Sequence, residues 1–220
     1  MFNPWIHLPH TAPLVLSLDK EILDAFNRRI QTQFAFHFGL YPEPFIGNPG
    51  APIVFLGLNP GLNPNNVATP TNPQLLQAYY DNLNHHNREY PMYLLDPSIG
   101  GEGYTWWTRR LRPLLHLFPQ QYIAQHIFVV EYFPYHSHKW SYRTPKIPSQ
   151  AYTFWLVRQA IQRESIIILM RSHALWNAAI PELSQYLHCY RLNSTQNITI
   201  SRNNCPQGFP VIIKRLEQVL

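Results

Sequence analysis

Polar side chains that could bind or transform a ligand occur in three short stretches of this 220-residue chain. The first is Gly57-Leu58-Asn59-Pro60-Gly61, in which the Asn59 amide can orient a ligand or a water but cannot take up a proton. The second begins at Glu131, whose carboxyl group accepts hydrogen bonds when ionised and can donate one when protonated. The third surrounds Arg202, a cation among small polar residues that could contact a phosphate.

These stretches follow apolar runs that have the length of buried strands, at 52–58, 126–133, 165–170 and 186–192. The runs are rich in Val and Ile, and stretches with helical periodicity separate them, which is typical of parallel strands covered on both faces. The sequence therefore predicts a single α/β domain over residues 1–220, a three-layer αβα sandwich with a central, mainly parallel four-stranded sheet.

Helical periodicity is clearest at 17–30, 149–164 and 206–220, with Ser17 and Ser149 as expected caps of the first two helices. The Pro- and Gly-rich stretch before the first strand, 41–52, is predicted to be a connector. In sheets of this kind, ligands bind beyond the carboxyl ends of the strands. The following segments are therefore expected to meet at one edge: 57–63, 131–139, 171–173 and 193–204.

The charge balance is basic, with 17 Lys and Arg against 12 Asp and Glu and a formal net charge of +5. Such a balance favours a polyanionic partner such as nucleic acid. The two cysteines, Cys189 and Cys205, have no metal or catalytic spacing and fit reduced thiols. No signal-peptide pattern and no membrane-length apolar run occurs. A cytoplasmic monomer without membrane association is the expectation.

The stretch "YHSHKW" at 135–140 places His136 and His138 two residues apart, where they could share one face of a strand and bind a metal. Because no third ligand is evident near them, we expect no metal and no cofactor. Contact with a DNA phosphate by His138 or Lys139 is the favoured interpretation.

By composition alone, "GLNPG" is a tight turn after a strand, and it matches neither the Walker pattern nor Gly-x-Gly-x-x-Gly. A strand followed by this loop resembles the first motif of the uracil-DNA glycosylase superfamily, nearest its mismatch-specific uracil/thymine branch. The resemblance implies that Asn59 holds the attacking water and that Gly57 and Leu58 border the base. It also implies that Pro60 and Gly61 let the backbone approach the flipped nucleotide.

Two later segments resemble the superfamily in order and placement. "FVVEYFPYHS" at 128–137 is similar to its second strand, which ends in a base-reading residue at the position of Glu131, and the pocket implied there could also include Phe133 and Tyr93. "RLNSTQNITISRNNCPQGF" at 191–209 is similar to its late strand and DNA-wedging loop. The resemblance implies DNA contacts by polar residues of this late loop: Asn193, Ser201, Arg202 and Asn203. The alternatives are a solvated loop arginine and, for the aromatic rings, core packing.

Glu131 departs from the uracil-specific members, which have an Asn at this position. An Asn amide donates to O4 of uracil and accepts from N3–H, whereas a carboxylate cannot donate to O4. A Glu can accept from cytosine N4, and a protonated Glu can also donate to N3. Burial would favour that protonated form. A cytosine-derived base with a recognisable 5-substituent, as in phage DNA, is therefore expected, with an ion pair to Arg171 as the structural alternative for Glu131.

Together these features predict a monofunctional DNA glycosylase that hydrolyses the N-glycosidic bond of a flipped, deaminated or modified pyrimidine in DNA. Its role would lie in DNA repair or in defence against phage. Two alternatives stay open. Since the first and late motifs contain no acidic or histidine catalyst, a non-catalytic nucleic-acid-binding module on the same fold is one, and a hydrolase or transferase acting on a small nucleotide is the other. The superfamily's iron–sulfur cluster needs four cysteines and is not expected.

Overall fold

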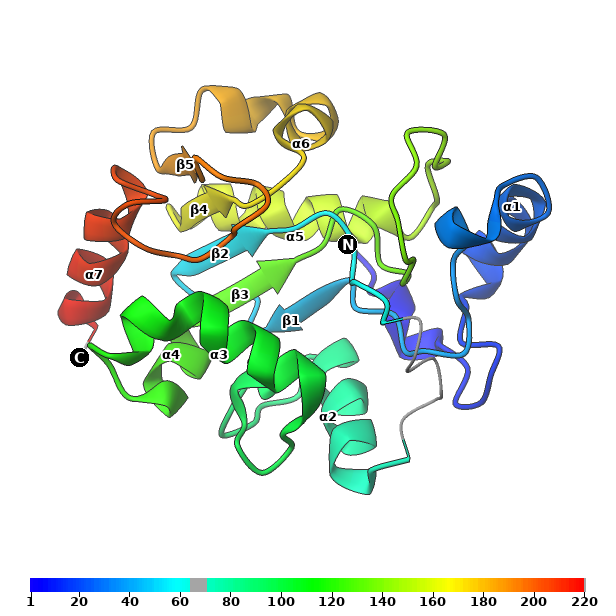
Figure 1. Cartoon of the computed structure of the whole chain (residues 1–220), viewed down its shortest axis with the longest axis horizontal. Helices are drawn as coiled ribbons and strands as arrows, with labels where there is room; N and C mark the ends of the chain where they lie inside the picture. The colour runs from blue at the N-terminus through cyan, green and yellow to red at the C-terminus, as the bar shows by residue number, and fades with distance from the viewer. Residues whose placement is uncertain (64–70, 220) are drawn as a thin grey trace.

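A five-stranded sheet forms the centre of the computed structural model, which describes residues 1–63 and 71–219 (Figure 1). The strand order is β1-β3-β2-β4-β5, and the strands β2 to β5 run parallel. This confirms the four predicted strands. The strand bounds are β1 (Phe45–Gly47), β2 (Ile53–Leu56), β3 (Ile127–Val130), β4 (Ile166–Leu169) and β5 (Cys189–Arg191).

The fifth strand, β1, lies inside the stretch 41–52, and the prediction that this stretch is only a connector is wrong. β1 pairs antiparallel with β3, with Phe45 opposite Val130 and Gly47 opposite Phe128. It has three residues and is bounded by Pro and Gly, so it produces no apolar run in the sequence. The antiparallel direction places the start of β1 beside the end of β3.

Helices cover both faces of the sheet (Figure 1). Their bounds are α1 (Ser17–Asn27), α2 (Pro73–Leu83), α3 (Gly101–Leu115), α4 (Gln120–His126), α5 (Gln150–Gln162), α6 (His173–Ala179) and α7 (Gly208–Gln218), with 3-10 turns at Pro4–His7, Thr32–Phe34, Tyr93–Leu95 and Pro181–Ser184. The predicted helices correspond to α1, α5 and α7. The expected caps are not formed: Leu16 precedes α1, and Ser149 makes no side-chain cap bond. No helix of the described residues is long and apolar enough to cross a bilayer.

Successive residues of each strand point to opposite faces of the sheet, and this alternation divides the core into two clusters. Ile53 and Phe55 pack in one cluster with residues of α3, α4 and α7. Val54 and Leu56 pack in the other with residues of α5 and α6. Both faces are therefore apolar and helix-covered, which confirms the predicted three-layer αβα sandwich.

The carboxyl ends of the parallel strands and the start of β1 meet at one edge of the sheet. In Figure 1, β2 and β3 point toward the end of the molecule where α1 lies. The loop that follows β2 and the segment that follows β3 meet there in an isolated parallel bridge between Gly61 and Ser137. Residues distant in sequence thus come together at the edge where a ligand site was expected.

Candidate active site at the carboxyl edge of the sheet

The loop Gly57–Gly61 is held in place by the backbone of the segment after β3 and by one buried indole. The Gly57 N–H donates to Val130 O at 2.9 Å, and the Phe133 N–H donates to Leu58 O at 2.9 Å. Trp176 Nε1 donates to Gly57 O at 2.7 Å from within the core. The loop is thereby fixed before it reaches Asn59.

Asn59 is half-buried, and its side-chain amide has only one possible orientation. Nδ2 donates to Ser137 Oγ at 3.0 Å and to Pro60 O at 3.1 Å, with Tyr135 O at 3.5 Å. Carbonyl oxygens can only accept, so the nitrogen of the amide must face them. Ser137 in turn donates to Lys139 O at 3.1 Å. In the described structure no group donates to Asn59 Oδ1, which is left to accept a hydrogen bond from a water or a ligand.

His136 connects the loop to the segment before β1. Its Nδ1 lies 2.7 Å from Gly61 O and its Nε2 lies 3.0 Å from Tyr41 O. Both ring nitrogens therefore lie within hydrogen-bond distance of a backbone carbonyl. With both ring nitrogens engaged, His136 cannot pair with the exposed His138 to bind a metal. Within residues 1–63 and 71–219, no three His, Cys, Asp or Glu side chains are grouped to hold one.

Glu131 places its carboxyl group directly over the backbone of Gly57. A Cβ at Gly57 would lie 2.2 Å from Glu131 Oε2, so only glycine leaves room for the carboxyl in this position. Oε2 is buried and has no hydrogen-bond partner in the described part of the chain. Burial, supported by the nearby charge of Glu43 and opposed by that of Arg171, raises the pKa of Glu131 to about 8. At neutral pH the protonated acid therefore predominates.

The ion pair proposed as the structural alternative for Glu131 is not formed among the described residues. Arg171 instead uses Nε to donate to Thr195 O at 3.1 Å. A buried carboxyl oxygen without a partner is costly, and such a group in a native fold requires an explanation. A ligand that bonds to Glu131 would provide one.

Glu43 is a second carboxyl group at this edge that the sequence analysis missed. It lies two residues before the start of β1, and its N–H donates to Pro134 O at 2.9 Å. Its Oε1 accepts from Tyr93 Oη at 3.2 Å and from Tyr79 Oη at 3.4 Å. The only signal in the sequence is an acidic residue between two prolines ahead of an apolar pair, and the Pro- and Gly-rich stretch around it predicts a connector.

The two aromatic rings expected to stack on the base lie in the packed interior. Tyr93 is fully buried, and its ring meets Tyr79 edge to face at 5.3 Å between centroids. Phe133 is also fully buried and stacks on Phe36 at 4.4 Å. Neither ring presents a free face to solvent. The predicted phosphate contacts His138 and Lys139 are exposed. Of the two residues expected to let the backbone approach the nucleotide, Gly61 is exposed and Pro60 is buried.

The late loop contains the predicted DNA contacts after β5, and Asn204 holds it together. Asn204 Nδ2 donates to Asn197 O at 2.6 Å and to Thr199 O at 3.0 Å. The Asn193 N–H donates to Asn204 O at 2.8 Å, and Ser201 Oγ accepts from the Asn204 N–H at 3.3 Å. Asn193 and Ser201 thus contribute to the loop's own structure.

The far side of the late loop is open to solvent at two adjacent residues. Arg202 and Asn203 are both exposed, and the Asn203 carbonyl accepts from Asn193 Nδ2 at 3.2 Å. The loop therefore presents the predicted cation, Arg202, at the surface. The Asn204 hydrogen bonds that hold the loop together were not predictable from the sequence.

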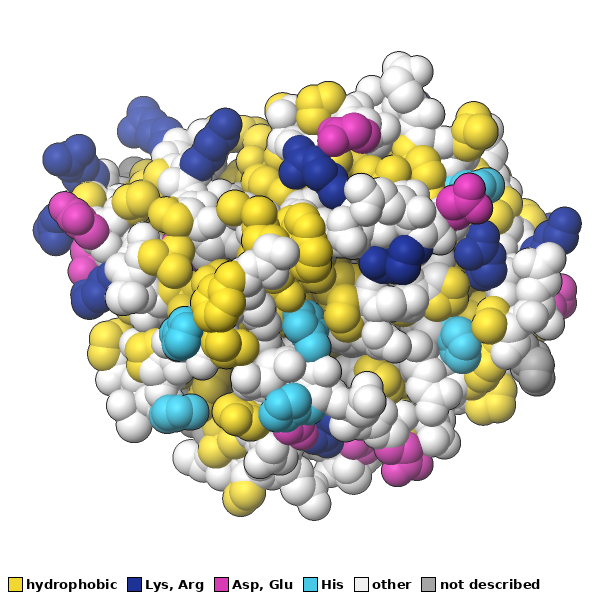
Figure 2. Space-filling model, turned by 180° about the vertical axis from the view of Figure 1, so that it is seen from behind, with side chains coloured by type: hydrophobic (Ala, Val, Ile, Leu, Met, Phe, Trp, Pro, Cys, Tyr) yellow, Lys and Arg dark blue, Asp and Glu magenta, His cyan; other side chains and the backbone are white. Residues whose placement is uncertain are grey.

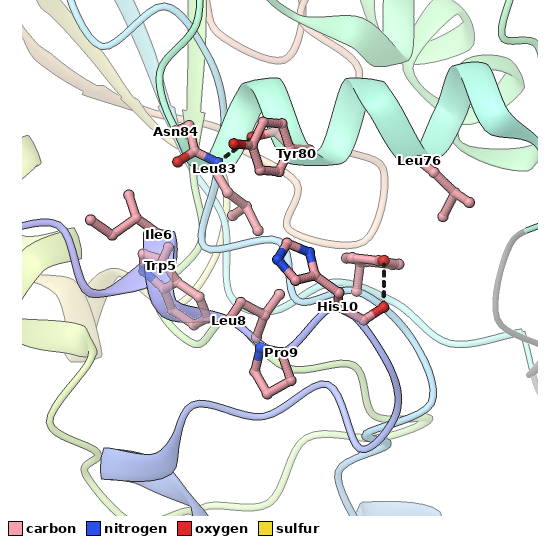
Figure 3. A pocket seen from close by; sticks show the side chains of 10 residues that line it. Trp5, Ile6, Leu8, Pro9, His10, Leu76, Tyr80, Leu83 and Asn84 are labelled. Carbon is pink, nitrogen blue, oxygen red and sulfur yellow. Dashed lines mark hydrogen bonds between the residues drawn. The ribbon is translucent and has the colours of Figure 1, made fainter.

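A small cavity lies apart from these residues, between the N-terminal segment and α2 (Figure 3). Its volume is about 40 Å³, which leaves room for little more than a water. Trp5, Leu8, His10 and Tyr80 are among its lining side chains, and none of the predicted site residues is. We assign it no part in the chemistry of the edge.

Comparisons of the chain with protein-family models, with curated proteins and with solved structures found no match. The assignment of a function therefore depends on the residues and geometry described above.

Proposed function

We propose that this chain is a monofunctional DNA glycosylase that hydrolyses the N-glycosidic bond of a flipped, deaminated or modified pyrimidine. The observation that carries the proposal is the Asn59 amide, whose nitrogen donates to Ser137 Oγ and Pro60 O and whose Oδ1 accepts from no described residue. Glu131 Oε2, which is buried against Gly57 without a described partner, supports it. Asn59 Oδ1 can accept a hydrogen bond from a water, and the Glu131 carboxyl can form hydrogen bonds with the edge of a base.

Hydrolysis of an N-glycosidic bond passes through a sugar with oxocarbenium character. Asn59 Oδ1 accepts a hydrogen bond from the attacking water and so directs a lone pair of that water toward C1′. The amide does not take the proton, so the electrophilic sugar must draw the water in before the proton is lost. Orientation of this kind can contribute several kcal/mol to catalysis.

Glu131 contacts the base in this scheme, and its protonation changes the expected selectivity. An ionised carboxylate would face uracil O4 with a second acceptor. The pKa of about 8 keeps the acid protonated at neutral pH, and a neutral carboxyl group has one donor and one acceptor. It can donate to uracil O4 while accepting from N3–H, or donate to cytosine N3 while accepting from N4. Protonated Glu131 can therefore pair with either uracil or cytosine. Selection of a 5-modified cytosine would have to come from other residues of the pocket.

The proposed partner is DNA that contains the altered base, and the protein is proposed to act as a cytoplasmic monomer. None of the proposed steps requires a metal or cofactor, because orientation by Asn59 and proton donation by Glu131 are side-chain functions.

A panel of oligonucleotides tests the proposal. Single strands and duplexes carry uracil, a thymine mismatch, cytosine, or hydroxymethylated or glycosylated cytosine, and abasic sites are scored by alkaline cleavage. We expect an abasic site from at least one altered pyrimidine and an intact strand before alkali. Binding of every DNA without base release would identify a binding module instead. Turnover of free nucleotides alone would identify a small-nucleotide enzyme.

A further inference from the structure

The segment between β3 and α5 leaves the candidate site directly beside Asn59. Ser137, which accepts the Asn59 hydrogen bond, immediately precedes the stretch 138–146, whose exposed residues are His138, Lys139, Tyr142, Arg143 and Lys146. At the other end, the Ser149 N–H donates at 3.1 Å to a buried carboxylate of α1. Both ends of the segment are therefore fixed, and one of them is fixed on the proposed water-binding residue. Figure 1 shows the segment as a yellow-green loop that extends away from the sheet.

A turn at the tip of this segment presents two side chains to solvent. The Thr144 N–H donates to Ser141 O at 3.1 Å, and the Arg143 N–H donates to Ser141 Oγ at 3.2 Å. Between them, Tyr142 is 96% exposed, more than any other large apolar residue of the described chain. A ring so exposed contributes almost nothing to packing of the fold, whereas the hydrogen-bonded turn beneath it is fixed.

The surroundings of Tyr142 are cationic. The segment contains no acidic residue, and its exposed basic side chains are those of His138, Lys139, Arg143 and Lys146. Arg143 also lines a cleft of about 340 Å³, together with Arg29, just after α1, and apolar side chains that include Phe26. Figure 2 shows Lys and Arg side chains gathered at the end of the molecule that carries α1.

An exposed aromatic ring among cations fits the structure of nucleic acid. The ring can stack on a base, and the cations can contact the flanking phosphates. Flipping a nucleotide out of a duplex leaves a gap in the base stack, and filling it offsets part of the unstacking cost. A side chain that fills the gap must stand close to the residues that receive the flipped base. Tyr142 lies five positions beyond Ser137, on a segment fixed at that site.

We propose that Tyr142 inserts into the base stack of double-stranded DNA where the flipped nucleotide has left it, with Arg143 on an adjacent phosphate. This inference rests on the proposed function, since it assumes that the nucleotide is received near Asn59 and Glu131. It assigns the wedge to the segment after β3, and leaves Arg202 of the late loop as a phosphate contact.

The test compares Tyr142→Ala with wild type in single-turnover base release from a duplex and from a single strand of the same sequence. Single strands need no unstacking, so we expect the variant to lose roughly 10-fold or more on the duplex and less than about 2-fold on the single strand. Tyr142→Trp should retain the duplex rate. Leu187→Ala, which truncates an 86% exposed residue before β5 at the opposite edge of the sheet, is the matched control. Equal rates for wild type and Tyr142→Ala on the duplex, or equal losses on both substrates, would overturn the inference.

A second readout separates this inference from the proposed function. If wild type releases no base from any DNA, the glycosylase proposal is wrong, and 2-aminopurine placed beside the target position then tests the wedge on its own. Fluorescence that rises when wild type binds the duplex, but not when Tyr142→Ala binds, supports insertion. The same response from both proteins, or none from either, contradicts it. Arg202→Ala should give the same fluorescence increase as wild type. Loss of that increase in Arg202→Ala would show that Arg202 of the late loop, and not Tyr142, inserts into the base stack.

Discussion

The loop after β2 and the loop after β5 both lie at the carboxyl edge of the sheet, but their polar groups are used differently. In the late loop, Asn204 and Ser201 bond to other parts of the loop. Beside the loop after β2, Glu131 Oε2 is buried without a described partner, and Asn59 Oδ1 likewise accepts from no described residue. The late loop therefore uses its polar groups for its own structure, whereas the first loop leaves polar groups free for a ligand.

The unpartnered carboxyl of Glu131 should make the free energy of unfolding depend on pH. Below pH 4.5 Glu131 is protonated in both the folded and the unfolded chain; between 4.5 and about 8 only the folded chain keeps the proton. The free energy of unfolding therefore falls as pH rises through this window. Glu131→Gln, which carries no charge, should lose less stability between pH 5 and pH 9, by on the order of 3 kcal/mol.

Denaturant unfolding of both proteins at the two pH values measures this effect. Glu21→Gln, at an exposed position of α1, is the control and should follow wild type. Parallel pH profiles for wild type and Glu131→Gln would mean that the Glu131 carboxyl has a partner or solvent after all.

The close approach of Glu131 to Gly57 can be tested by a pair of glycine substitutions. Gly57→Ala places a methyl group 2.2 Å from Glu131 Oε2, so the carboxyl must move, at a cost of about 1–3 kcal/mol and with loss of base release. Gly61→Ala, which has no atom within 4 Å of its Cβ, should cost little. In a Glu131→Ala background the Gly57 substitution should become nearly neutral, and an unchanged cost there would show that another contact is responsible.

In the late loop, the expected effect is on stability and not on chemistry. Asn204→Ala removes donors from two carbonyls and should lower the free energy of unfolding by about 1–2 kcal/mol. Base release from single strands should stay within a few-fold of wild type. Asn203→Ala, one position earlier and exposed, is the control. A reversed result, with unchanged stability and abolished base release, would place Asn204 among the site residues.

The smallest expected effect is on DNA affinity. Arg202→Ala should weaken binding and reduce the slope of log K against log salt by about one, as for the loss of a single phosphate contact. Fluorescence anisotropy between 50 and 200 mM salt measures it. An unchanged slope would identify Arg202 as a solvated loop arginine.

Local patterns predicted β2, β3 and β4 well because each of these parallel strands is a fully buried apolar run. β2 and β4 are such runs, and the position of Asn59 at the end of β2 followed from them. β1 could not be found in this way, because its three residues are buried by pairing with β3 and not by a pattern of their own. Glu43, which lies just before β1, was missed for the same reason.

The side-chain environments at the site depend on contacts between distant residues, which no local pattern contains. The Trp176 indole on Gly57 O joins residues 119 positions apart, and the Asn59 bond to Ser137 joins residues 78 apart. The sequence suggested a buried and protonated Glu131, but only the three-dimensional arrangement separates an unpartnered carboxyl from the alternative ion pair with Arg171. The sequence also could not show that Tyr93 and Phe133 are core residues, because aromatic residues are plentiful in this chain and no local pattern separates a core ring from a base-stacking ring.

Base release by Asn59→Ala tests the central claim most directly. The best substrate of the oligonucleotide panel is mixed with excess wild type or variant, and abasic sites are counted over time, with DNA affinity and thermal unfolding measured in parallel. Because Oδ1 acts on the water and not on the bound DNA, we predict a loss of roughly 100-fold or more in rate with DNA affinity nearly unchanged. Loss of the Nδ2 bonds to Ser137 Oγ and Pro60 O should lower the free energy of unfolding by about 1–2 kcal/mol, which leaves the variant folded. Turnover comparable to wild type in a folded, DNA-binding Asn59→Ala protein would contradict the account.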